Sequence, residues 1–206
     1  MKQKYFIDSN KAATALVIFT LIAIYDQWSN TTAWVYLAMH GTYGILWLIK
    51  SRVFPDKKWE RRTSLWFGIL IWVGLSLYWI APWIIVSQGV EAPNWFLAAC
   101  ISIFAFGVFL HFSSDMQKFV SLKLRPYNLI TEGLWGLVRN PNYLGELLFY
   151  GGFGLLAMHL LPMGILLLWI IVIWIPYMRR KDSSLSRYPG FEEYKSKTKL
   201  FLPYIF

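Results

Sequence analysis

Long stretches without a charged residue constrain this chain more than any other feature. Four runs free of Lys, Arg, Asp and Glu have 14 to 24 residues, and a fifth, Leu147 to Met178, has 32. A helix needs roughly 20 apolar residues to cross the hydrocarbon core of a bilayer, so runs of this kind predict transmembrane helices. The four shorter runs are Ala12 to Tyr25, Thr32 to Ile49, Ser64 to Ser87 and Trp95 to Phe112.

The fifth run is too long for a single crossing and contains Pro162. Because proline has no backbone N–H and interrupts a helix, we expect two helices joined by a tight turn at His159 to Pro162. This gives about six crossings, the last two of which form a C-terminal helical hairpin. A composition with 57% hydrophobic and 15% charged residues also excludes an ordinary soluble domain. The expected fold class is an all-α polytopic membrane protein.

The basic residues fall on one side of the predicted membrane. All 20 Lys and Arg residues lie in the N-terminal tail, the second and fourth connections and the C-terminal tail. The opposite connections carry only Asp26 and Glu91. Since Lys and Arg are retained on the cytoplasmic side, both termini are predicted to be cytoplasmic, in a multi-pass protein of a bacterial inner membrane. Retention also explains the net charge of +9, so no nucleic-acid partner is expected.

Two long polar segments, residues 113–141 and the tail after Met178, flank the predicted hairpin on its cytoplasmic side. There a water-soluble cofactor can meet a substrate dissolved in the lipid. We therefore expect one membrane domain, residues 1–206, with a substrate-side half at 1–112 and a cofactor-binding half at 113–206. Cys100 is the only cysteine, so a disulfide and a metal site are not expected. The oligomeric state is not indicated.

The segment from Gly133 to Glu146 has a pattern typical of a helix start. Asn140-Pro141 ends any preceding helix, and we expect the next helix to begin at Tyr143 with Asn142 as its N-cap. Glu146 then lies in the first turn, where the helix dipole favours a carboxylate. A well-capped membrane helix explains these residues. A functional role explains them equally well, since ionisable groups at the edge of a membrane span are costly.

Several motifs of the C-terminal half occur together in known membrane enzymes. Asn142 to Glu146 has the form Asn-Tyr-x-Gly-acid, Arg139 to Gly145 has the form Arg-x-Pro-x-Tyr-x-Gly, and Trp135 lies seven residues before Asn142. Upstream are Ser114-Asp115 and Gln117-Lys118. The set resembles the superfamily that joins steroid 5-alpha reductases and sterol reductases to isoprenylcysteine carboxyl methyltransferases and phospholipid methyltransferases. The Asn-Tyr-x-Gly-acid form resembles the reductase branch, and Arg-x-Pro-x-Tyr-x-Gly is shared by the methyltransferase branch.

The tail adds weaker matches. Arg180-Lys181-Asp182 is similar to an Arg-Asp-Asp motif of the reductases, although Lys181 stands where an acid is usual. Tyr188-Pro189-Gly190, Tyr194 and the ending from Leu202 also resemble the steroid reductases. Short bacterial proteins of uncharacterised function, the DUF1295-like branch, share this C-terminal domain.

The reductase resemblance implies NADPH-dependent reduction of a lipid-soluble steroid-like or enone substrate, with hydride transfer at the cytoplasmic membrane face. Asn142, Tyr143 and Glu146 would then hold the nicotinamide, Glu146 also taking part in catalysis. Trp135 would stack nearby, and Tyr194 would belong to the same site. Arg180, Arg139 and Lys118 are the candidates for phosphate contacts, because cationic groups donate strong hydrogen bonds to phosphate, and Asp115 and Asp182 would orient ribose or those cations. Each basic residue is explained equally well by membrane topology.

The alternative function is an S-adenosylmethionine-dependent methyltransferase acting on a membrane lipid or an isoprenylcysteine-like acceptor. It leaves Glu146 unexplained. A non-enzymatic transporter subunit or scaffold is a third class, but no paired charged residues mark an ion path in the middle of the predicted helices.

A reductase also needs a group that polarises the substrate carbonyl. His40 and Tyr43 lie near the middle of the second predicted span, three residues apart and therefore on one helix face. Both can donate a hydrogen bond, and they are the catalytic candidates of the N-terminal half. A histidine bonded to a neighbouring helix is the competing explanation. His111 is expected to mark the cytoplasmic edge of its helix, and His159 the outer turn.

Overall fold

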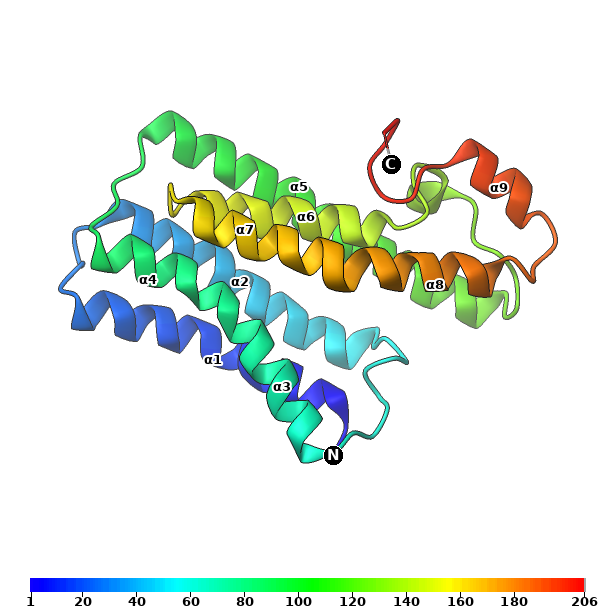
Figure 1. Ribbon diagram of the computed structural model, residues 1–206, viewed down its shortest axis with the longest axis horizontal. Helices are drawn as coiled ribbons and strands as arrows, with labels where there is room; N and C mark the ends of the chain where they lie inside the picture. Colours follow the sequence, from blue (N-terminus) through cyan, green and yellow to red (C-terminus); the bar gives the residue numbers. More distant parts are fainter. Residues whose placement is uncertain (206) are drawn as a thin grey trace. The chain divides into compact units, whose positions relative to one another are not determined.

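The computed structural model describes residues 1–205, which form helices joined by turns and loops (Figure 1). The described residues contain two isolated bridges and no strand, so the predicted all-α class is confirmed. In chain order the elements are α1 (Gln3–Ile24), α2 (Thr31–Val53), α3 (Leu65–Ser76), the 3₁₀ turn η1 (Leu77–Trp79), α4 (Ile80–Ser87), α5 (Asn94–Leu124), the 3₁₀ turn η2 (Gly133–Gly136), α6 (Pro141–Leu155), α7 (Leu160–Trp169), the π-helical segment η3 (Ile170–Trp174), α8 (Ile175–Leu185) and α9 (Phe191–Lys197).

Local chemistry fixes several of the helix ends. The Asn30 side chain accepts a hydrogen bond from the Ala33 amide at 2.9 Å at the start of α2, and Ser64 accepts from Phe67 at 3.3 Å at the start of α3. The two helices predicted on either side of this turn are confirmed, but the turn lies at residues 156–159, slightly before the predicted His159 to Pro162, because α6 ends at Leu155 and α7 begins at Leu160. Proline near the start of α7 costs little, since the first amides of a helix have no partner within it.

A proline also accounts for the 3₁₀ turn that separates α3 from α4. Pro82 has no N–H to donate to the carbonyl of Tyr78 four residues earlier. The Tyr36 hydroxyl of α2 donates to that carbonyl at 3.2 Å instead. The carbonyl that lacks a helical N–H donor at this interruption is therefore bonded by a side chain of α2.

Four helical segments are long and apolar enough to cross a membrane. They are Gln3–Ile24, Leu65–Ser87, Asn94–Leu124 and Leu160–Leu185. The protein therefore has the helices of a membrane protein. α2 and α6 are not among the four, and with 15 residues α6 is shorter than the roughly 20 residues that a crossing requires. Six crossings, the sidedness of the termini and the bacterial inner membrane stay predictions.

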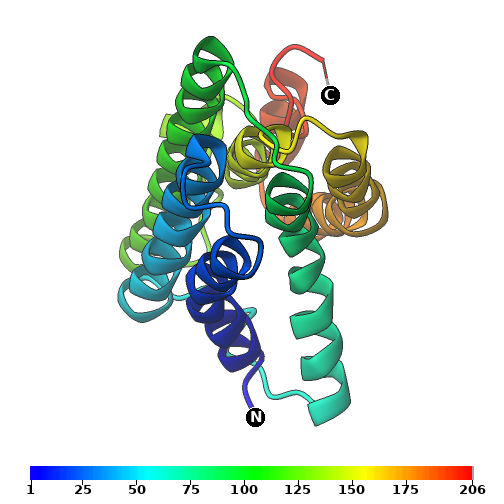
Figure 2. The ribbon, with the colours of Figure 1, turned by 90° about the vertical axis from the view of Figure 1, so that its left-hand side faces the viewer.

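The chain divides into two compact units. Unit 1 comprises Met1–Phe104 and Gly151–Ile165, and unit 2 comprises Ala105–Tyr150 and the chain from Leu166 onward. In unit 1, α1 and α2 lie side by side in both ribbon views (Figure 1 and Figure 2). They approach so closely that a Cβ on Gly44 would lie 2.6 Å from the Lys11 carbonyl oxygen. The functional division expected at residues 112 and 113 stays a prediction.

Two glycines bring α5 and α6 together in unit 2. A Cβ on Gly145 would lie 2.5 Å from the His111 amide nitrogen, and one on Gly107 would lie 2.7 Å from the Gly145 carbonyl oxygen. Only residues without a side chain allow the two backbones this close. The contact places the middle of α5 against the first turns of α6, where the sequence predicts a functional site.

Candidate cofactor site

The first turn of α6 differs from the sequence prediction by two residues. The helix begins at Pro141, and the Asn140 carbonyl accepts backbone hydrogen bonds from Tyr143 at 3.1 Å and Leu144 at 3.2 Å. The expected N-cap role of Asn142 is therefore wrong, because Asn142 lies inside the first turn. Proline is favoured at a first helical position, since its missing N–H would have no helical partner there.

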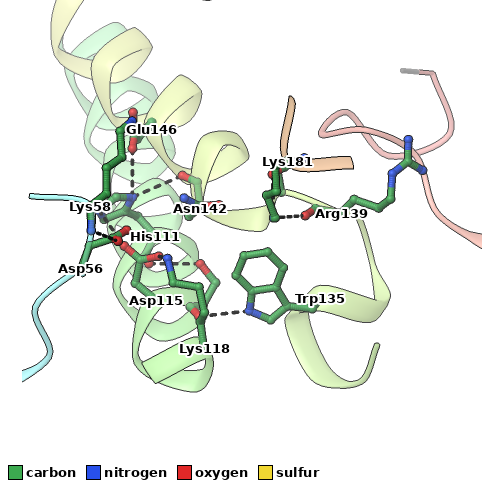
Figure 3. Close-up of polar contacts among 12 residues, drawn as sticks. Asp56, Lys58, His111, Asp115, Lys118, Trp135, Arg139, Asn142, Glu146 and Lys181 are labelled. Atoms are coloured by element: carbon green, nitrogen blue, oxygen red, sulfur yellow. Dashed lines mark hydrogen bonds and ion pairs between the residues drawn. The ribbon is translucent and has the colours of Figure 1, made fainter. Parts of the chain in front are cut away.

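His111 is the residue that α5 presents to this turn. Its side chain is buried, with Nδ1 3.2 Å from the Asn142 carbonyl oxygen and 3.6 Å from Glu146 Oε1. A carbonyl oxygen only accepts hydrogen bonds, so the contact with Asn142 requires the proton to be on Nδ1. Figure 3 shows His111 directed toward Asn142 and Glu146. The sequence predicts His111 only as a marker of the cytoplasmic edge of its helix and does not predict these contacts.

The same face of α5 carries an acid and a base. Asp115, one turn after His111, is buried, and its Oδ2 lies 3.8 Å from His111 Nε2. Lys118 Nζ lies 3.4 Å from Asp115 Oδ1. Residues three and four apart share a helix face, which explains why these three side chains meet. Asp115 and Lys118 therefore lie together with His111, and their cofactor-binding roles stay predictions.

Trp135 is held rigidly in the loop before α6. Its indole N–H donates to the Ser114 carbonyl at 3.1 Å, and its own carbonyl accepts from the Tyr194 hydroxyl at 2.7 Å. The Gln117 side chain binds the turn that precedes Trp135. It donates a hydrogen bond to the Glu132 carbonyl at 2.8 Å and accepts one from the Leu134 amide at 3.1 Å. The contacts of Trp135 tie the loop to α5 and to α9.

Tyr194 is predominantly buried in α9. Burial disfavours the phenolate and raises the pKa of Tyr194 well above its ordinary value of 10.0. The hydroxyl therefore remains a hydrogen-bond donor at every physiological pH.

Arg139 binds the C-terminal tail. Its Nε donates to Asp182 Oδ2 at 2.9 Å, and its Nη1 donates to the carbonyls of Lys195 and Thr198. The Arg139 amide donates to the Lys199 carbonyl at 2.9 Å. The sequence predicts Arg139 as a candidate for phosphate contacts. In the structure its guanidinium group binds the C-terminal tail and therefore already has a structural role.

Lys181 lies over the ring of Trp135. Its Nζ is 4.1 Å from the ring centre and donates to the Arg139 carbonyl and to Asn140 Oδ1, both at 2.8 Å. Asn140 in turn donates to the Leu200 carbonyl at 3.0 Å. Lys181, the residue that departs from the expected Arg-Asp-Asp pattern, therefore belongs to the polar cluster at the start of α6. This cluster consists of His111, Asp115, Lys118, Trp135, Arg139, Asn140, Asn142, Glu146, Lys181, Asp182 and Tyr194.

Two buried acceptors of the cluster, Asn142 Oδ1 and Asp182 Oδ1, have no hydrogen-bond partner among the described residues. Buried polar atoms are nearly always hydrogen-bonded, so such atoms indicate a missing donor. A nicotinamide carboxamide and the ammonium group of S-adenosylmethionine both supply N–H donors. The residues present therefore fit a cofactor of either kind at this place.

Other predicted residues lie away from these contacts. Arg180 is exposed, and Tyr143 packs on Trp174 with ring centres 5.4 Å apart. In unit 1, His40 is buried and stacks on Phe153, with their ring centres 4.3 Å apart. Its Nδ1 is 3.1 Å from the Tyr36 hydroxyl, and its ring centre is 6.3 Å from that of Tyr43. His40 and Tyr43 thus share a helix face as predicted, and their catalytic roles stay predictions.

The sequence prediction missed His111, Asn140 and Lys181 as members of the cluster. The spacing of His111 from Asp115, four residues on one helix, was a signal that was available. Nothing in the sequence indicated that Asn140 and Lys181 meet, because they are 41 positions apart.

Residues 1–205 combine four apolar helices of membrane-spanning length with a buried polar cluster at the start of α6, the features of a membrane protein with a candidate small-molecule site. A family model described as a protein of unknown function (DUF1295) matches residues 52–198, and the chain belongs to this family. The expected membership of the DUF1295 family is thereby confirmed, and its place in the reductase branch stays a prediction. A comparison with curated proteins gives no match. The matched range includes every residue of the cluster discussed above.

Proposed function

We propose that this protein is an integral-membrane reductase that uses NADPH to reduce a lipid-soluble enone or steroid-like alkene. The observation that carries the proposal is the buried Asn142 carboxamide oxygen without a partner, one helical turn before Glu146. A nicotinamide carboxamide presents an N–H donor of the kind that this oxygen lacks. His111 fixes the turn that holds both residues.

The charge of the surrounding chain supports a polyanionic cofactor. Residues 113–206 contain eleven Lys and Arg residues and six Asp and Glu residues. NADPH carries several negative charges on its phosphates, whereas S-adenosylmethionine is a cation at its sulfonium centre. A basic surrounding raises the local concentration of an anionic ligand.

Bound NADPH would supply the hydride for one carbon of an activated double bond, and the other carbon would take a proton from the protein or solvent. Asn142 and Glu146 would hold the nicotinamide. A hydrogen-bond donor would also be needed to polarise the substrate carbonyl, so that negative charge can develop on its oxygen, and His40 and Tyr43 remain the candidates that the sequence offers for this role. The apolar helices would admit a substrate from the lipid.

The second candidate is an S-adenosylmethionine-dependent methyltransferase of a membrane lipid or isoprenylcysteine-like acceptor. The buried Asp182 Oδ1, a carboxylate oxygen without a hydrogen-bond partner among the described residues, favours it, because it suits a cationic ligand. Two basic residues of the cluster, Lys118 and Lys181, oppose it.

The test is a pair of binding titrations on the purified protein in detergent, one with NADPH followed by nicotinamide fluorescence and one with S-adenosylmethionine followed by calorimetry. The wild type is expected to bind NADPH saturably, and Asn142→Ala to bind it about tenfold more weakly, the effect of losing one buried hydrogen bond. Asn128→Ala is the matched control, since Asn128 is exposed in the loop before α6. Saturable S-adenosylmethionine binding without NADPH binding would replace this proposal by the second candidate.

A further inference from the structure

His40 is a buried histidine of α2 whose hydrogen bonding the proposed reductase does not explain. The residue is 1% exposed, and its Nδ1 lies 3.1 Å from the hydroxyl oxygen of Tyr36, one turn earlier on the same helix face. Either group can be the donor in this contact, because a histidine ring nitrogen and a tyrosine hydroxyl can each donate or accept. The second hydrogen bond of Tyr36 decides between the two cases.

The single proton of the Tyr36 hydroxyl is directed to the Tyr78 carbonyl. Tyr36 donates to that oxygen at 3.2 Å, and a carbonyl oxygen can only accept. The carbonyl takes a side-chain donor because Pro82, four residues later, has no N–H to offer it. Tyr36 Oη must then accept from His40, which places the ring proton of His40 on Nδ1. A proline in α4 thus sets the tautomer of a histidine in α2.

The other ring nitrogen, His40 Nε2, forms no hydrogen bond with any of the residues 1–205. His40 also forms no ion pair within this part of the chain. A doubly protonated ring would need an acceptor at Nε2 and would be a buried charge without a counter-charge, which is costly. The geometry therefore fits a neutral ring with a lone pair on Nε2, and a nitrogen in this state accepts a hydrogen bond.

The rings in contact with His40 are aromatic. Phe153 stacks on its face, with ring centres 4.3 Å apart and an interplanar angle of 12°, and the ring centres of Tyr36 and Tyr43 lie 5.6 Å and 6.3 Å away. A buried water makes about three hydrogen bonds to polar groups, which such walls do not favour. Ligand sites combine apolar walls with a few polar atoms that fix orientation. A hydroxyl group on an apolar body matches one acceptor between aromatic rings.

We propose that His40 binds the hydroxyl group of a lipid-soluble alcohol, with Nε2 as the acceptor and Tyr36 as the positioning residue that sets the tautomer. Sterol-like and isoprenoid alcohols are the ligand class, because they present one O–H on a large apolar body. Of the two residues that the sequence offers for polarising a carbonyl, Tyr43 is then the donor candidate. The inference goes beyond the proposed reductase, since these residues all belong to unit 1 and the binding requires no cofactor.

The first measurement is nitrogen NMR of the full-length protein in phosphatidylcholine nanodiscs, with isotopically labelled histidine rings. The chain has three histidines, so the signals of His40 are those that persist when His111 and His159 are replaced. The wild type is expected to show a protonated Nδ1 and an unprotonated Nε2 at His40. Tyr36→Phe removes the acceptor of the Nδ1 proton and is expected to abolish this preference. A proton on Nε2 in the wild type would overturn the proposal.

The second measurement is titration with cholestanol and with cholestanone, which differ only in bearing a hydroxyl group or a carbonyl group at the same carbon. Cholestanol is expected to move the Nε2 signal saturably toward the protonated range, and cholestanone to leave it unchanged. His40→Phe retains an aromatic ring and should bind cholestanol about tenfold more weakly, the effect of losing one buried hydrogen bond. His159→Asn is the matched control and should bind it as the wild type does, because His159 is exposed.

The outcomes are decisive with or without the variant. An Nε2 signal that neither sterol moves, or that both move equally, would overturn the proposal, and these two titrations need only the wild type. Unchanged cholestanol affinity in a folded His40→Phe protein would also overturn it. Failure of NADPH to bind would overturn the proposed reductase and leave this inference standing.

Discussion

His111 Nδ1 lies 3.2 Å from the main-chain oxygen of Asn142, a residue 31 positions away on another helix. This contact joins α5 to the first turn of α6 and places Glu146 3.6 Å from the same nitrogen. The imidazole therefore fixes the two side chains that we assign to the nicotinamide. Its role is to position them.

Replacing His111 by Phe should weaken cofactor binding. An aromatic ring is retained, but the Asn142 carbonyl loses its donor, at a cost of about 1–3 kcal/mol if that energy is expressed in binding. NADPH titration checks the expectation, with His159→Asn as control, because His159 is exposed and accepts a hydrogen bond from the Leu161 amide that an Asn can also accept. Equal affinity of the His111 variant and the wild type would contradict the positioning role.

Gly145→Ala should separate α5 from α6. The added methyl group would lie 2.5 Å from the His111 amide, and relieving such a contact typically costs about 1–3 kcal/mol. Gly151→Ala in the same helix is the matched control, because a Cβ there meets nothing within 4 Å. Alanine is the better helix former by about 1 kcal/mol, so this control should raise stability slightly. Thermal unfolding in detergent, followed by circular dichroism, measures both variants.

Arg139→Lys should loosen the C-terminal tail. A lysine can retain the charge opposite Asp182 but cannot reach the carbonyls of Lys195 and Thr198 at the same time, since it lacks the planar fork. The expected loss is about 1–3 kcal/mol, seen as faster proteolysis of residues 186–205. Arg125→Lys, at an exposed pair with Glu132, should not change the rate. A protected tail in the Arg139 variant would show that other contacts hold it.

Tyr194 should make the stability of the protein fall at high pH. Its pKa is raised in the folded state above the ordinary value of 10.0, so the folded protein retains a proton that the unfolded chain releases. The contribution of Tyr194 is therefore fully present below about pH 10 and is lost as pH rises toward the folded pKa. In Tyr194→Phe this decline should be smaller, and stability at pH 7 should be lower by about 0.5–1.5 kcal/mol. The free energy of unfolding between pH 8 and pH 11 tests this, with Tyr204→Phe as the exposed control.

Most helices could be located from the sequence, because their cause is local. Charge-free runs, Asn30, Ser64 and Pro162 act within a few residues of their own position. The described helices cover the predicted runs, but α1 begins at Gln3, well before Ala12, and α5 continues to Leu124, well beyond Phe112. The start of α6 is the exception, because Asn142 resembles a cap but proline is favoured at a first helical position, so the helix begins two residues before the predicted Tyr143.

From the amino-acid sequence alone it follows that this chain is helical and rich in apolar segments of membrane-spanning length, and the same sequence predicts a site at Asp115, Trp135, Asn142 and Glu146. The tertiary structure decided which of the marked residues meet. Gly107 and Gly145 let two backbones touch, which brings His111 to α6, and the returning tail gives Arg139 its partners and places Lys181 over Trp135. Such pairings join residues 31 to 59 positions apart, and no local pattern encodes them, because they depend on how whole helices pack.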